Sequence, residues 1–122
     1  MTTATIDKMV GENIVITTNG GVDDTKTRIT FADGTTEEYD WSGDFTDQNW
    51  ISAGIWDDNL EWVKEPVTIT FGTAVKRIVG NTTLGISDSL TTVVFTGVTD
   101  IAGERMFDGD NALTSVTFSS SI

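Results

Sequence analysis

The second half of the chain repeats itself at a spacing of about 23 residues, a period found in solenoid proteins. The run Leu90-Thr-Thr-Val-Val-Phe95 recurs as Leu113-Thr-Ser-Val-Thr-Phe118, and an earlier copy, Pro66-Val-Thr-Ile-Thr-Phe71, precedes both. The apolar positions between these runs recur at the same interval. One short β run in each repeat of this length is typical of a solenoid. The pattern therefore predicts a mainly β protein built from stacked coils.

The apolar residues alternate within each run, and their period of two puts them on one face of a strand. The threonines between them then point outward, where β-branched side chains suit a pleated surface. Stacking at about 4.8 Å makes a short parallel ladder. In that ladder Phe71, Phe95 and Phe118 lie over one another.

These residues resemble the BspA-type leucine-rich repeat. The resemblance is carried by Leu90-Thr-Thr-Val-Val-Phe95, Val98-x-x-Ile101-x-Gly103, Phe107-x-Gly109 and Leu113-Thr-Ser-Val116. It implies a short leucine-rich-repeat-like solenoid of about 2.5 coils over residues 66–122. In that family the repeats are binding scaffolds of bacterial surface proteins and phage proteins, without catalytic residues. Asp110 stands where the family has cysteine, and Leu84 stands where it has phenylalanine.

Residues 1–65 are acidic and contain all four tryptophans, and we expect them to form an N-terminal cap within a single domain, 1–122. A strand is predicted at 13–18. A hairpin is predicted from strands 28–31 and 37–41, with Gly34 at a positive φ in a three-residue loop. Thr46 is predicted to cap a short helix over 47–55.

The composition excludes several functions. The chain has no cysteine and no histidine, so disulfides, Cys/His zinc sites and imidazole-dependent catalysis are excluded. The net charge of −12 disfavours direct binding to nucleic acid. No apolar run reaches about 18 residues, so no membrane span is predicted. No secretory signal is visible, which fits cytoplasmic synthesis or association with a virion. We expect no enzyme activity, no cofactor and no metal site.

The tryptophan-rich segment is the first candidate for a ligand site. Aromatic rings beside carboxylates suit a sugar or a cationic peptide. The alternative is that these tryptophans close the end of the solenoid and that the acids form a solvated rim, which the usual burial of large aromatic residues favours. The candidate ligand-binding residues are Trp41, Trp50, Trp56, Trp62, Asp57 and Asp58.

The end of the chain is the second candidate surface. The sequence stops at the first corner of a third coil, and no capping unit follows. The strand at 114–118 is then expected to have an open edge above an apolar underside, which favours a homo-oligomer, a dimer first, or a docked partner. The candidate interface residues are Phe107, Leu113, Val116, Phe118 and Ile122.

The sequence leaves three functions open. The first is a non-catalytic binding or adhesion module for a protein or glycan, in a phage or bacterial surface assembly. The second is a small acidic inhibitor that mimics nucleic acid, of the phage anti-defence type, because carboxylates can occupy a basic groove. The third is a purely structural oligomerisation piece.

Overall fold

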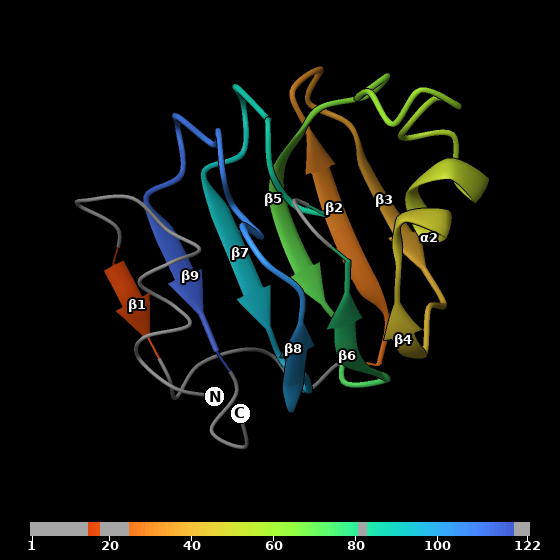
Figure 1. Cartoon of the computed structure of the whole chain (residues 1–122), viewed down its shortest axis with the longest axis vertical. Coiled ribbons are helices and arrows are strands. Elements are labelled where there is room, and N and C mark those ends of the chain that lie inside the picture. Colours follow the sequence, from red (N-terminus) through yellow and green to blue (C-terminus); the bar gives the residue numbers. More distant parts are fainter. Residues whose placement is uncertain (1–14, 18–24, 81–82, 119–122) are drawn as a thin grey trace.

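Two β-sheets face each other, and the hydrophobic core lies between them (Figure 1). The computed structural model describes residues 15–17, 25–80 and 83–118. The larger sheet is mixed, with the strand order β1-β9-β7-β5-β2-β3, and the smaller sheet is parallel, with the order β4-β6-β8. The elements are β1 (Val15–Thr17), β2 (Thr27–Phe31), β3 (Thr36–Tyr39), β4 (Gly43–Phe45), α2 (Asp47–Ser52), β5 (Pro66–Phe71), β6 (Val75–Val79), β7 (Thr92–Phe95), β8 (Asp100–Ala102) and β9 (Ser115–Thr117).

The predicted parallel ladder is confirmed in β5, β7 and β9. Ile69 pairs with Val93, and Val93 pairs with Val116, so the register between neighbouring strands equals the sequence repeat. The phenylalanines stack as expected. The ring centroids of Phe71 and Phe95 lie 5.5 Å apart, and those of Phe95 and Phe118 lie 5.2 Å apart. The alternating apolar residues are buried, as the period of two requires.

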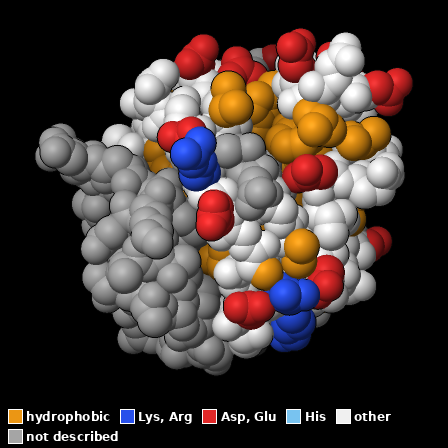
Figure 2. All heavy atoms as spheres, in the orientation of Figure 1, with side chains coloured by type: hydrophobic (Ala, Val, Ile, Leu, Met, Phe, Trp, Pro, Cys, Tyr) orange, Lys and Arg blue, Asp and Glu red, His pale blue; other side chains and the backbone are white. Residues whose placement is uncertain are grey.

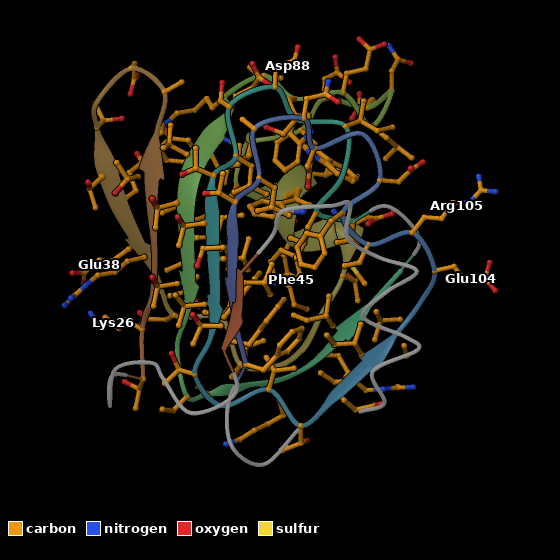
Figure 3. All side chains as sticks on the ribbon, turned by 90° about the vertical axis from the view of Figure 1, so that its left-hand side faces the viewer. Lys26, Glu38, Phe45, Asp88, Glu104 and Arg105 are labelled. Carbon is orange, nitrogen blue, oxygen red and sulfur yellow. The ribbon has the colours of Figure 1, made fainter. Side chains whose placement is uncertain are left out.

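The smaller sheet is not anticipated by the sequence analysis. Ile78 of β6 pairs with Ile101 of β8, although the sequence shows these positions only as recurring apolar residues. Each of the first two repeats therefore contributes one strand to the larger sheet and one strand to the smaller sheet. The acidic half adds β4, whose Phe45 pairs with Ile78. Figure 3 shows Phe45 between the two sheets, where its ring lies 5.0 Å from that of Phe71.

The predicted hairpin is confirmed in β2 and β3. Thr30 pairs with Thr36, and Phe31 donates its N–H to the carbonyl of Thr35, which leaves a three-residue loop. Gly34 has a φ of 90°, the left-handed conformation that glycine adopts without strain. The hairpin joins the repeats because β2 pairs antiparallel with β5.

The helix begins where it was predicted and ends earlier. The hydroxyl of Thr46 accepts the N–H of Gln48, and the side chain of Asn49 accepts the N–H of Thr46. Together with the Thr46 contact to the Asn49 backbone, these bonds form a capping box. The helix ends at Ser52 rather than at residue 55, because Gly54 has a φ of 74° and turns the chain.

The expectation of an open edge on the last repeat is wrong. β1 pairs in parallel with β9, in the register Val15 to Ser115, so that edge is covered. The same pairing divides the predicted N-terminal cap, because β1 lies at one end of the larger sheet and β2 and β3 lie at the other (Figure 1). The 1–65 segment is therefore not one cap at one end of the repeats.

The candidate interface at the end of the chain was predicted from an open strand edge and an exposed apolar underside, and the structure shows neither in the described residues. Its described side chains belong to the core and form no apolar patch on the surface of the single chain. The homo-oligomer stays a prediction with no observation in its favour. The buried residues are Phe107, Leu113, Val116 and Phe118, and Ile122 lies outside the described residues.

Replacing Phe95 by Ala should lower the free energy of unfolding by about 3–5 kcal/mol, because the ring is fully buried between two stacked rings. Thr96→Val is the control. The Thr96 hydroxyl is buried without a partner in the described part of the chain, so this change should be neutral or stabilising. Urea unfolding of both variants measures the difference. Similar losses in the two would contradict this packing.

Candidate functional site

The four tryptophans differ in what they contact. Trp50 of α2 is fully buried, and its indole N–H donates to the backbone carbonyl of Thr83 at 2.8 Å. It belongs to the core and cannot contact a ligand, which corrects its place among the candidate ligand residues. Trp41 is half-buried and stacks on Tyr39 at 4.3 Å. Trp56 and Trp62 pack edge to face, 5.3 Å apart, beside a cleft.

The cleft has a volume of about 570 Å³, within the range of small-molecule sites. It lies where the loop between α2 and β5 meets the turn at Gly85 and Ile86, in the segment between β6 and β7. Figure 2 shows hydrophobic side chains gathered over this region, with acidic side chains around them and no Lys or Arg among the atoms described there. The lining residues are Asp47, Trp56, Asn59, Leu60, Glu61, Trp62, Glu65, Gly85 and Ile86.

Two aliphatic residues of the cleft are both exposed and strained. Leu60 has a φ of 62° with 53% of its surface exposed, and Ile86 has a φ of 58° with 68% exposed. A left-handed backbone costs an L-residue about 1–2 kcal/mol, and it is least suited to a β-branched side chain such as Ile86. More than half of the surface of each residue is exposed, so side-chain burial offsets only part of the cost of this backbone conformation. Strain of this kind is concentrated at functional sites.

The next repeat has a glycine at the position equivalent to Ile86. Gly109 occupies the equivalent position of the next repeat and has a φ of 80°, so both repeats turn in the left-handed conformation at this point. A Cβ on Gly109 would lie 3.2 Å from the Cα of Ile86, so the two turns stack. The first repeat thus holds isoleucine where the second holds glycine. The sequence analysis missed Leu60 and Ile86, although this glycine-to-isoleucine exchange could have revealed Ile86.

The loop that carries Leu60 is held by Asp57. One carboxylate oxygen of Asp57 accepts the backbone N–H groups of Asn59 and Glu61, at 2.9 and 3.1 Å. A backbone bridge between Trp56 and Trp62 closes the loop. Asp57 therefore acts within the turn. Asp58 is exposed, and neither Asp57 nor Asp58 is among the residues that line the cleft.

Glu65 and Asp110 order the turn that carries Ile86. Glu65 accepts the backbone N–H of Asp88 at 3.0 Å, and Asp110 accepts that of Ser87 at 2.8 Å. Burial raises the pKa of Asp110 to about 8, with a smaller contribution from the neighbouring charge of Asp108. The hydrogen bond from the backbone N–H of Ser87 lowers the pKa of Asp110 and so opposes the effect of burial. Asp110 therefore takes part in the turn, and its burial favours the protonated form of its carboxyl group.

One tryptophan that lines the cleft has a buried indole N–H without an acceptor in the described part of the chain. Trp56 is only 6% exposed, and its Nε1–H makes no hydrogen bond within the described part of the chain. By contrast, the indole N–H of Trp62 donates to the carbonyl of Gly85 at 3.0 Å. Leaving a buried donor unsatisfied costs about 1–3 kcal/mol. The lining of the cleft therefore carries an unmet hydrogen bond as well as backbone strain.

The described residues contain no cluster of three or more Asp or Glu placed to hold a metal ion. Within the same ranges, no helix has the length and apolar character needed to cross a membrane. Comparison of the chain with protein-family models, curated proteins and solved structures finds no match. The arguments about function therefore rest on the cleft itself.

Replacing Ile86 by Gly should raise the free energy of unfolding by about 1 kcal/mol, because glycine adopts this φ without strain. Val63→Gly is the matched control. Val63 is also an exposed apolar residue, at 61%, but it does not have a positive φ. Its replacement should lower stability by about 0.5–1 kcal/mol. Thermal unfolding compares the two, and a destabilised Ile86→Gly variant would show that Ile86 is not strained.

Asp110 should make stability depend on pH. Its pKa in the folded chain lies above the ordinary value of 3.8, so the folded state keeps a proton that the unfolded state releases. Stability should therefore fall as the pH rises from about 4 to about 8. Asp110→Asn should remove this part of the decline, and Asp58→Asn, which removes an exposed charge, should not. Urea unfolding across this pH range measures both, and parallel curves for wild type and Asp110→Asn would contradict the assignment.

Proposed function

We propose that this chain is a non-catalytic recognition module that binds a protein or a glycan in the cleft beside Trp56 and Trp62. The observation that carries the proposal is the strained backbone of two exposed aliphatic residues on that cleft, Leu60 and Ile86. More than half of the surface of each residue is exposed, so neither belongs to the hydrophobic core. A ligand that contacts them supplies the reason for keeping them.

The chemistry of the chain supports binding rather than catalysis. The sequence contains no histidine or cysteine. Two acidic residues of the cleft stabilise the fold through hydrogen bonds. Asp47 accepts the hydroxyl of Thr83 at 2.9 Å, and Glu65 accepts the hydroxyl of Ser87. A cleft with apolar walls and a few polar groups is the usual form of a binding site.

We also infer that the fold is a short solenoid of the BspA-like leucine-rich-repeat type. The support is the offset of 23 or 24 residues in both sheets, where each strand of one repeat pairs in register with the equivalent strand of the next. Hydrogen bonds from two threonine hydroxyls that lie just before strands join residues at the same offset. Thr91 donates to the carbonyl of Val67, and Thr114 donates to that of Thr91. Such repeats provide extended binding surfaces. A phage or bacterial surface assembly fits this interpretation.

The surface charges favour recognition over mimicry of nucleic acid. On the hairpin, Arg28 pairs with Glu38 at 3.0 Å and Lys26 with Asp40 at 3.8 Å, and on the smaller sheet Arg77 contacts Asp100 at 2.8 Å. Bases thus alternate with acids there. A nucleic-acid mimic needs a continuous face of one sign to enter a basic groove.

The proposal predicts that ligands of the chain depend on the cleft. Purified wild type and variants would be applied to a printed glycan array and to an array of random dodecapeptides. Signals given by wild type should fall about tenfold in Ile86→Gly and Leu60→Gly, the size expected when a central apolar contact is lost. They should persist in Val63→Gly. Signals that survive in both cleft variants would place recognition elsewhere.

A further inference from the structure

We propose that the ligand of the cleft is a basic, apolar peptide segment of a partner protein. This inference rests on the proposed function and names its ligand. The first argument is charge. The ionisable residues that line the cleft are Asp47, Glu61 and Glu65, all acidic, and no lysine or arginine occurs among its described lining residues. A cleft of one sign attracts a partner of the opposite sign and selects against the same sign.

The carboxylates of the cleft keep acceptor capacity. Asp47 uses one oxygen for the hydroxyl of Thr83, and Glu65 uses one for Ser87 and Asp88. The carboxylate of Glu61 makes no hydrogen bond or ion pair within the described part of the chain, and Glu61 is exposed. These oxygens can accept charge-assisted hydrogen bonds from a lysine or arginine of the ligand.

The base in the same loop does not neutralise them. The ammonium group of Lys64 bonds the carboxylate of Glu37 on the hairpin at 3.0 Å and lies 4.3 Å from the centre of the Phe31 ring. Lys64 lines a second, smaller hollow, which shares Trp62 and Glu65 with the cleft but contains Lys64 in place of Glu61. The negative charge of the cleft is therefore left for a ligand to compensate.

The apolar surface favours a peptide over a sugar. Sugars stack on the exposed faces of aromatic rings, but Trp56 is only 6% exposed and Trp62 is largely covered. Among the lining residues of the cleft, the large apolar residues that are mostly exposed are the aliphatic Leu60 and Ile86. They suit an aliphatic side chain, or the methylene stem of a lysine whose ammonium group reaches the acids.

The unsatisfied donor of Trp56 fits the same ligand. A peptide brings backbone carbonyl groups, which are the acceptors that the Trp56 Nε1–H lacks. The nitrogen is buried, so binding requires the edge of the indole to turn toward the cleft. We therefore expect the tryptophan emission to shift when a peptide binds.

The test measures binding to the full chain by isothermal titration calorimetry and tryptophan emission. The probes are an acetylated and amidated octapeptide that alternates leucine and lysine, its leucine–glutamate counterpart, chitohexaose and maltohexaose. The lysine peptide should bind and should shift the emission. The glutamate peptide should bind at least about tenfold more weakly.

Matched variants connect the binding to the cleft. Glu61→Gln should weaken the lysine peptide about threefold, as expected for an exposed charge pair. Ile86→Gly should weaken it about tenfold while the protein stays folded. Asp58→Asn is the control, because it removes an equal charge from the same loop outside the cleft lining and should leave the affinity unchanged.

The outcomes separate this inference from the proposed function. If a hexasaccharide binds and Ile86→Gly abolishes its binding, the cleft is a recognition site and the peptide inference is overturned. If the lysine peptide binds all variants equally, the attraction is diffuse, and the inference and the cleft as binding site are both overturned. A lysine peptide that does not bind wild type also overturns the inference.

Discussion

The offset of 23 or 24 residues between stacked strands is the constraint on which this structure depends. Phe71, Phe95 and Phe118 stack only because the strands that carry them pair in a register equal to the sequence repeat. A slip of one residue would turn each ring from the core to the surface. The smaller sheet obeys the same offset, since Ile78 faces Ile101. Ion pairs on the outer surface also join residues 23 positions apart, as Arg77 does with Asp100. These ion pairs are a consequence of the strand stacking and not its cause.

The acidic half completes this stack at the hairpin end. β2 extends the larger sheet, β4 extends the smaller one, and Phe45 and Trp50 fill the space between them, with ring centroids 4.8 Å apart. The loop from α2 to β5 must then cross the end of the core to reach the first repeat. It carries Trp56 and Trp62 over the turn at Gly85, and the cleft is the space left where loop and turn meet. The candidate site is thus a product of the junction between the two halves.

In the function proposed for the cleft, stability and recognition oppose each other. Gly109 makes the repeat turn without strain, whereas Ile86 makes the same turn with its side chain in solvent. Leu60 repeats the pattern in the neighbouring loop. Natural proteins retain such local costs where function needs the side chain, and the surrounding hydrogen bonds hold the conformation. Here Asp57 and Glu65 provide those bonds.

The sequence by itself determined the elements that depend on local patterns. Period-two alternation located β5, β7 and β9, the turn residues at Gly34 located the hairpin, and Thr46 located the start of the helix. Only the tertiary structure decided the rest. β1 pairs with β9, a strand from the far end of the sequence, and β8 is too short to show a period. The cleft is equally non-local: the turn at Ile86 stacks on the turn at Gly109, 23 residues later in the sequence, and no pattern of neighbouring residues encodes that contact.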